Sequence, residues 1–199
     1  MRGITNAQGI TGPDLNGILE RLSLLENNPP VGSVTQFAGF DWVVAHWDTA
    51  NSVMYMALKD IYSMTKFAET SSGVTYENST LKQQLDDFAS TLITGRNVGD
   101  SEAFNHRLAK VFVPTIEQLE TEFAFLKIAI SGKKNYAYSI ANYQGQAVPW
   151  WTSTVADFSR QNPNLSDCAY CFEADGRYGV FYATTQTAGF RPFICIKMR

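Results

Sequence analysis

The sequence predicts an α+β domain that is preceded by an extended arm and a short helix. The chain of 199 residues is 45% hydrophobic, which is typical of a globular protein. Short apolar segments bounded by turn residues predict strands, and two later stretches carry apolar residues at helical spacing. The first 12 residues are instead polar and rich in glycine. We therefore expect an arm over 1–12, a helix with its linker over 13–30, and a globular domain over 31–199.

Residues 13–30 are expected to form a short helix that associates with copies of itself. Asp14 is placed to cap its first turn, and Pro29 with Pro30 ends it. A helix of this length is marginal alone in water. It packs either on its own domain or against other copies, and the proline break favours a dimer or trimer. Four apolar residues, spaced as in a coiled-coil seam, are Leu15, Ile18, Leu22 and Leu25.

The first part of the globular domain is expected to consist of strands. Residues 34–37, 41–47 and 53–58 have the composition of strands. The polar turn over 48–51 joins the last two into a hairpin. A further short strand is expected at 111–114.

Two helices are expected within the same domain. Ser79 or Thr80 is placed to cap the first of them, and the second begins at Thr115, which forms a capping-box pattern with Gln118. The first helix, over 81–92, is predicted from four apolar residues at helical spacing. These are Leu81, Leu85, Phe88 and Leu92.

The end of the chain is expected to form a group of antiparallel strands. Residues 131–147 are expected to form a loop before them, and Asp175 with Gly176 predicts a tight turn between two of them. Successive residues of a strand point to opposite faces. Of the neighbours Trp150 and Trp151, one is therefore expected in the core and the other facing outward or into a loop. The strands are expected at 150–155, 168–174, 179–184 and 190–197.

Three motifs in this part of the chain, together with the order of the elements, resemble a known fold family. They are Trp150 to Ser153, Asp175 with Gly176, and Gly189 to Pro192. The segments 76–81 and 113–115 also resemble the starts of the two helices in that family. The combination is similar to the C-type-lectin-like fold of the bacterial and phage branch, which includes sulfatase-modifying-factor-like and unknown-function domains and occurs in phage fibre and receptor-binding proteins. The resemblance covers about residues 33–199 and implies two helices packed on short antiparallel sheets.

The chemistry of the better-known branches of this family is not carried by these residues. The Arg-Gly-Gly-Ser segment of the copper-dependent, cysteine-oxidising branch is absent. Cys168 and Cys171 have the spacing of a thiol pair, but zinc needs four ligands, and His46 and His106 lie far away in sequence. The segment 161–164 contains Asn-Pro-Asn but lacks the acidic residues that a calcium-dependent sugar site uses. We therefore expect no enzymatic activity, no metal and no cofactor.

Aromatic residues before and at the start of the final strands are the candidates for ligand contact. Loops commonly display binding surfaces, and flat aromatic rings stack on sugars or fill protein interfaces. The same side chains could instead form an aromatic core, and both interpretations stand. Arg191, next to Pro192 at a strand start, is expected to hydrogen-bond loop carbonyls or a carboxylate. The candidates are Tyr136, Tyr138, Tyr143, Trp150 and Trp151.

The layout of arm, helix, proline break and globular head favours a non-enzymatic phage virion structural protein of the fibre or receptor-binding type. Residues 1–30 would join it to other virion proteins and to its own copies, as a homo-oligomer that in such fibres is commonly a trimer. The head would bind a host-surface glycan or protein. The alternatives are a purely architectural capsid decoration or baseplate subunit and a bacterial enzyme of the modifying-factor type.

Charge and hydropathy exclude other partners. A net charge of −3 gives no basic surface for nucleic acid. No run of 18 apolar residues is present, so we expect no membrane insertion. No signal-peptide pattern is found at the start, and we expect synthesis in a host cytoplasm followed by assembly into the virion.

Overall fold

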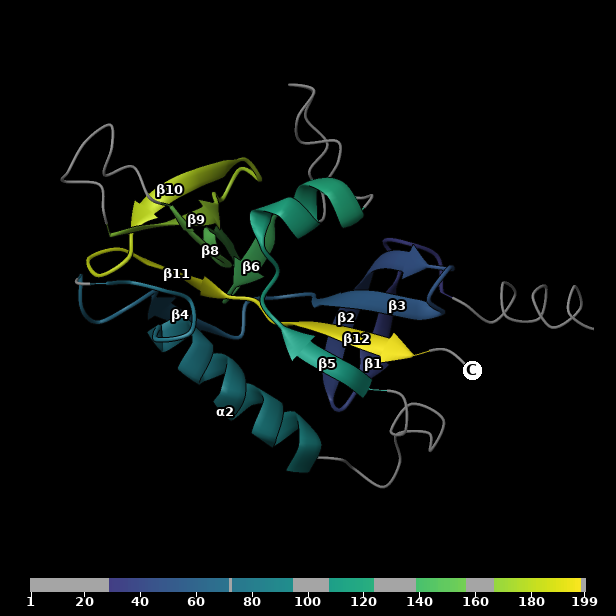
Figure 1. Ribbon diagram of the computed structural model, residues 1–199. Coiled ribbons are helices and arrows are strands. Elements are labelled where there is room, and N and C mark those ends of the chain that lie inside the picture. Colours follow the sequence, from purple (N-terminus) through teal and green to yellow (C-terminus); the bar gives the residue numbers. More distant parts are fainter. Residues whose placement is uncertain (1–28, 72, 95–107, 124–138, 157–166, 198–199) are drawn as a thin grey trace, which may run out of the picture. The chain divides into compact units, whose positions relative to one another are not determined.

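The computed structural model describes residues 29–71, 73–94, 108–123, 139–156 and 167–197 (Figure 1). Contacts divide the chain into two units, Met1–Pro30 and Val31–Arg199, and the elements below all belong to the second. The expected arm and helix lie outside the described residues except for Pro29 and Pro30. The same is true of the predicted seam of Leu15, Ile18, Leu22 and Leu25.

The described part of the chain is mainly β. It contains twelve strands but a single α-helix, α2 (Thr80–Thr94). The predicted α+β, C-type-lectin-like arrangement of two helices packed on short antiparallel sheets is therefore wrong. The structure contains more strands than the sequence predicted. The three strands that were not predicted are β4 (Ser63–Lys66), β6 (Ala141–Tyr143) and β7 (Gln146–Val148).

The second predicted helix begins as expected but is very short. The capping box forms, because the Thr115 N–H donates to Gln118 Oε1 at 3.0 Å and the Gln118 N–H donates to Thr115 Oγ1 at 3.1 Å. The five residues that follow form a π-helix, η1 (Gln118–Glu122). Phe123 then takes an extended backbone conformation and is fully buried. A capping box determines where a helix begins but not how far it continues.

The first sheet holds the start and the end of the domain together (Figure 1). All of its neighbouring strands are antiparallel. The last strand of the chain is inserted between β3 and β5. In spatial order the sheet contains β1 (Val34–Phe37), β2 (Phe40–Asp48), β3 (Val53–Leu58), β12 (Phe193–Lys197) and β5 (Leu108–Phe112).

The second sheet is mixed, with one parallel pair between β11 and β8. The strand predicted over 190–197 is divided between the two sheets, because it breaks at Arg191 and Pro192 and leaves β11 in this sheet and β12 in the first. A single strand over 190–197 was therefore the wrong prediction, and the break is explained by Pro192, which cannot donate a ladder hydrogen bond. In spatial order the sheet contains β10 (Tyr178–Tyr182), β9 (Cys168–Phe172), β8 (Trp150–Ala156), β11 (Thr187–Phe190) and β4.

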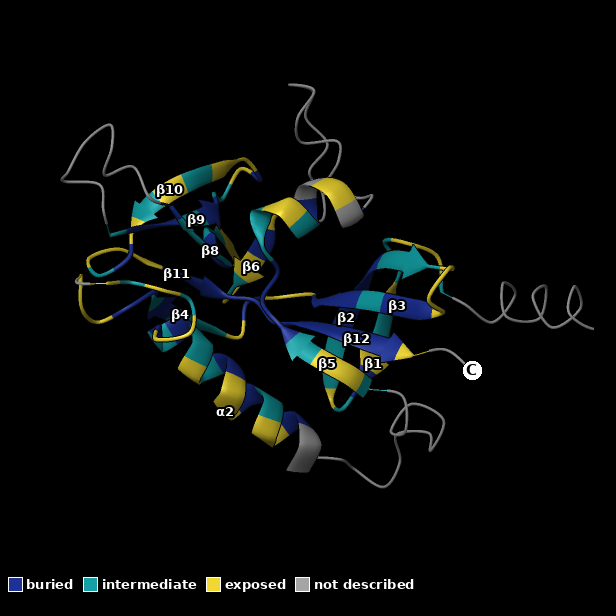
Figure 2. Ribbon diagram, viewed as in Figure 1, coloured by how far each residue is buried: buried dark blue, intermediate teal, exposed yellow. Residues whose placement is uncertain are grey.

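Both faces of β8 are covered by hydrophobic cores. Trp151 packs edge-on to Phe67 in the larger core, at 5.6 Å between ring centroids. Trp150 belongs to a second core, in which it stacks on Phe172 at 4.6 Å and lies 6.2 Å from the Phe193 ring. Neither tryptophan is exposed, so the expectation that one of them faces outward is wrong. Figure 2 colours most of β8, β9 and β12 as buried.

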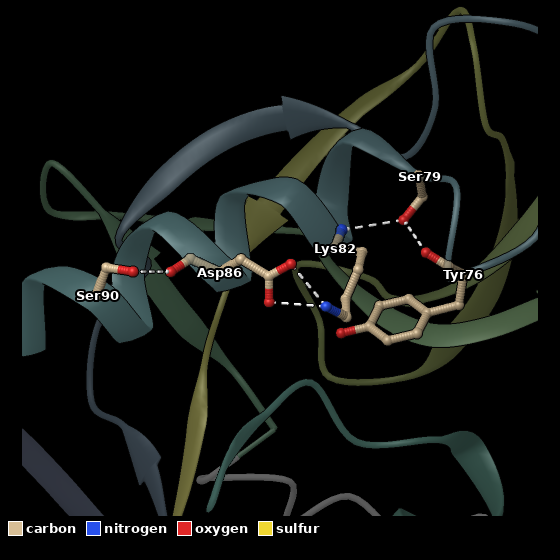
Figure 3. Close-up of polar contacts among 5 residues, drawn as sticks. All are labelled: Tyr76, Ser79, Lys82, Asp86 and Ser90. Atoms are coloured by element: carbon tan, nitrogen blue, oxygen red, sulfur yellow. Dashed lines mark hydrogen bonds and ion pairs between the residues drawn. The ribbon is translucent and has the colours of Figure 1, made fainter. Parts of the chain in front are cut away.

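Helix α2 closes the larger core, and Ser79 caps it as predicted. Ser79 Oγ accepts a hydrogen bond from the Lys82 N–H at 3.0 Å and donates one to the Tyr76 carbonyl at 2.6 Å (Figure 3). On the outer face, Lys82 and Asp86 form an ion pair at 2.7 Å with the favourable four-residue spacing. The buried face consists of the predicted residues Leu81, Leu85, Phe88 and Leu92.

Replacing Ser79 with alanine should lower the free energy of unfolding by about 1 kcal/mol, because the first turn of α2 loses its capping acceptor. Ser90→Ala is the matched control, since its exposed hydroxyl donates to the Asp86 carbonyl of the same helix and caps no helix end, so the change in stability should be less than about 0.5 kcal/mol. Chemical denaturation of the two variants measures the difference. Equal losses would show that the cap does not stabilise the helix.

Candidate functional site

A surface hollow of about 400 Å³ lies between two segments that are distant in sequence. This volume is within the range of small-molecule sites, which combine apolar and aromatic walls with a few polar groups. One wall is the turn between β1 and β2, and the other is the segment that follows β3. The lining residues are Gly39, Phe40 and Asp41 on the first wall and Leu58, Asp60, Ile61 and Tyr62 on the second.

The first wall is a tight hairpin turn. Phe37 and Phe40 pair across the turn, and the two residues between them, Ala38 and Gly39, have positive φ angles of 51° and 79°. Two-residue hairpin turns of type I′ require positive φ at both positions, which matches the twist of the strands. The turn places Phe40 and Asp41 on the side of the hollow.

The second wall is held by the motif that joins β11 to β12. The Tyr62 N–H donates to the Phe190 carbonyl at 3.0 Å, and the Leu58 N–H donates to the Pro192 carbonyl at 2.9 Å. The Leu58 carbonyl in turn accepts a hydrogen bond from Arg191 Nε at 2.7 Å. The segment between Leu58 and Tyr62 is therefore fixed at both ends by three consecutive residues.

Gly189 completes this attachment by making room for Ile61. A Cβ atom at position 189 would lie only 2.7 Å from two carbon atoms of the Ile61 side chain. The Ile61 N–H also donates to the Asn142 carbonyl in β6 at 2.8 Å. We refer to Gly189, Phe190, Arg191 and Pro192 together as the clamp, since all four contact the second wall of the hollow.

Arg191 is the buried centre of the clamp. Its side chain is 1% exposed and lies over the Trp150 ring, 5.1 Å from the ring centroid. Burial lowers the pKa of Arg191 to about 10, while the charge of Asp60 opposes this lowering. A charged guanidinium is therefore held inside the domain by a carbonyl, an aromatic face and a nearby carboxylate, as a buried charge requires. Arg191 was predicted to hydrogen-bond loop carbonyls or a carboxylate, and it does donate to a carbonyl, although the acceptor, Leu58, is the last residue of β3.

Tyr62 presents a ring of fixed orientation to the hollow. The residue is 44% exposed. Its ring packs edge-to-face against Phe40 at 6.1 Å, Phe88 at 4.9 Å and Phe190 at 6.0 Å between centroids. Such contacts favour defined ring geometries. A ligand would therefore meet an aromatic surface that is already in place.

The two carboxylates of the hollow each have a cation nearby. Asp41 Oδ2 lies 3.4 Å from Lys59 Nζ, and Asp41 Oδ1 accepts a hydrogen bond from Gln36 Nε2 at 3.1 Å. Asp60 is close enough to Arg191 for its charge to act on the arginine pKa. The hollow thus offers carboxylate oxygens as acceptors without an uncompensated negative charge.

The predicted contact residues do not line this hollow. Trp150 and Trp151 have no exposed surface, and Tyr143 is half-buried in β6. Tyr136 and Tyr138 lie outside the described residues. Trp150 instead supports the hollow from behind, through its contact with the clamp.

Sequence reasoning missed the residues that do line it. Phe40, Asp41, Asp60 and Tyr62 occur at the ends of strands, where loops commonly carry binding groups. Asp60 and Tyr62, which follow closely after the strand that ends at Leu58, were the feature of the sequence that could have indicated this site.

Within the described ranges, the three thiols and His46 show no catalytic arrangement. Cys168, Cys171 and Cys195 are buried and free, and burial, assisted by the Glu173 charge, raises the pKa of Cys171 to about 12. The ring of His46 lies 6.1 Å from that of Tyr55 and 6.2 Å from that of Phe123 between centroids. Among the residues that the structure describes, no group of three or more His, Cys, Asp or Glu could hold a metal ion. His106 and the segment 161–164 fall outside them.

The chain matches no family model, and no curated protein or solved structure is significantly similar to it. No helix in the described ranges is long and apolar enough to cross a membrane. The function is therefore inferred from the geometry of the chain itself.

Replacing Gly189 with alanine should destabilise the domain by about 1–3 kcal/mol, because the added methyl group collides with Ile61. Adding Ile61→Ala to Gly189→Ala removes the collision, so the double variant should be more stable than the sum of the two single effects predicts. A double-mutant cycle measured by chemical denaturation gives this coupling. Strictly additive effects would contradict the close contact between the clamp and Ile61.

Proposed function

We propose that this chain is a non-enzymatic phage virion protein of the fibre or receptor-binding type and that its globular domain binds a host-surface glycan in the hollow. The observation that carries the proposal is the combination of a fixed, partly exposed Tyr62 ring with two charge-balanced carboxylates. These are the groups that a pyranose ring needs, since its C–H face stacks on an aromatic ring and its hydroxyl groups donate to oxygen acceptors.

The balance of charge favours a neutral ligand. Asp41 is paired with Lys59, and the charge of Asp60 interacts with that of the buried Arg191. A cationic ligand would have to compete with these existing cations, and an anionic ligand would approach two carboxylates. Neutral hydroxyl groups can be accepted by either carboxylate without displacing its cation.

The environment of the carboxylates supports binding rather than hydrolysis. Glycoside hydrolases need one carboxyl group that stays protonated, usually in apolar surroundings. Asp60 is exposed and Asp41 is partly exposed, and each has a cation nearby. Neither carboxylate therefore lies in the apolar surroundings that are usual for the acid residue of a glycoside hydrolase.

A purely architectural role, as a capsid decoration or baseplate subunit, is the second candidate. It is favoured by a separate observation, the exposed row of Tyr178, Val180 and Tyr182 along β10. Such a row on an edge strand is suited to packing against another protein.

The full-length protein should bind at least one neutral glycan on an array. In a titration with that glycan, Tyr62→Ala should weaken binding about tenfold, because an aromatic contact contributes about 1 kcal/mol or more. Asp60→Asn changes no ring of the aromatic cluster and should also weaken binding, because an amide oxygen is a weaker acceptor than a carboxylate.

The matched control is Tyr178→Ala. Tyr178 is 45% exposed, against 44% for Tyr62, and does not line the hollow. The Tyr178→Ala variant should bind the glycan as tightly as the unchanged protein does. Loss of glycan binding in Tyr178→Ala, with Tyr62→Ala and Asp60→Asn unaffected, would place the site elsewhere. Failure of the unchanged protein to bind any glycan would refute the proposed function.

A further inference from the structure

The edge strand β10 leaves part of its backbone unpaired. It lies at the end of the second sheet and pairs only with β9. The Glu173 N–H donates to the Arg177 carbonyl, and the Ala183 N–H donates to the Asp167 carbonyl, which identifies the hydrogen-bonded pairs of this antiparallel ladder. Because these pairs alternate along the strands, Tyr178, Val180 and Tyr182 direct their N–H and C=O groups away from β9.

One end of this open edge is closed by the chain itself. Gln186 Oε1 accepts a hydrogen bond from the Tyr182 N–H at 2.7 Å, and the Gln186 N–H donates to the Tyr182 carbonyl at 3.2 Å. The backbone groups of Tyr178 and Val180 have no partner among the described residues. The stretch of β10 with an open backbone edge therefore runs from Tyr178 to Val180 and ends before Tyr182.

The two faces of β10 differ in chemistry at this stretch. On one face, the side chains of Tyr178 and Val180 are exposed and uncharged. On the other, Gly179 has no side chain, and a Cβ atom built on it would collide with the Glu173 carboxylate. Glu173 thus lies directly over Gly179. Its carboxylate has no ion pair within the described ranges.

We propose that β10 accepts an extended peptide segment of a partner protein as an additional strand, with a lysine or arginine of that segment opposite Gly179. Addition of a strand to an exposed sheet edge is a general mode of peptide recognition. The backbone groups of Tyr178 and Val180 supply the hydrogen bonds. The residue opposite Gly179 points to the same face as Glu173, so its basic side chain passes over the glycine and reaches the carboxylate.

The same geometry specifies the neighbours of the basic residue. The residues on either side of it lie opposite Tyr178 and Val180 and point to the exposed apolar face. The preferred segment therefore has a basic residue between two apolar, β-branched ones. This inference goes beyond the proposed function, since none of these residues lines the hollow.

Charge disfavours a second copy of this chain as the occupant. The antiparallel register that pairs both open residues of two copies places Gly179 opposite Gly179 of the other strand. The Glu173 carboxylate of each copy lies over its own Gly179, so the two carboxylates would come close together and repel each other. A charged residue directed at an open edge is also a known device against self-association.

The test uses two blocked synthetic pentapeptides and the full-length, isotope-labelled protein. One peptide is Thr-Val-Lys-Val-Thr, and the other has norleucine in place of lysine. In an NMR titration, the lysine peptide should shift the amide signals of Tyr178 and Val180, and it should bind about fivefold more tightly than the norleucine peptide, as expected for a partly exposed ion pair.

Two variants assign the effect to the edge and to the charge. Val180→Pro removes an outward-facing N–H without touching the ladder to β9 and should abolish binding of both peptides. Glu173→Gln should leave the norleucine peptide unaffected and bring the lysine peptide to the same affinity. The proposal would be overturned if the unchanged protein bound the lysine and norleucine peptides equally well, or if Val180→Pro bound them fully. It would also be overturned if the Tyr178 amide signal responded to a neutral oligosaccharide but to neither peptide.

Discussion

Arg191 carries its charge into the interior at the point where β11 of the second sheet is followed by β12 of the first. Burial of an ion costs several kcal/mol unless its donors find partners, so the surrounding structure is constrained to supply them. It does so with the Leu58 carbonyl and the face of Trp150. The strand break, the loop after β3 and the start of β8 are therefore fixed by one side chain. The position of the hollow's second wall follows from this constraint.

The two cores reinforce that constraint from both sides of β8. Trp151 donates its indole N–H to the Thr65 carbonyl in β4, and Trp150 donates its own to the Ser139 carbonyl before β6. Each buried ring thus satisfies its polar group on a different part of the chain, as buried tryptophans generally do. The result is a rigid support beneath the hollow. Preorganised surfaces lose less entropy when they bind a ligand.

Local patterns predicted local structure well here. The hairpin of β2 and β3, the helix α2 with its Ser79 cap, and the turn at Gly176 all follow from spacing and turn chemistry. The long-range features did not follow. A capping box at Thr115 could not show that the helix would end at Phe123, and alternation along β8 could not show that both of its faces are covered. The hollow combines segments around residues 40, 60 and 190, and no single segment reveals it.

The central claim is that the clamp makes the segment from Leu58 to Tyr62 as rigid as the core, although Tyr62 and Asp60 are exposed. Native-state hydrogen exchange of the backbone amides tests this directly, because protection reports the free energy of local opening. The amides of Leu58, Ile61 and Tyr62, which donate to Pro192, Asn142 and Phe190, should exchange as slowly as those of the central strands β3 and β12. Exchange of these three amides at the rate of an open surface loop would contradict the account.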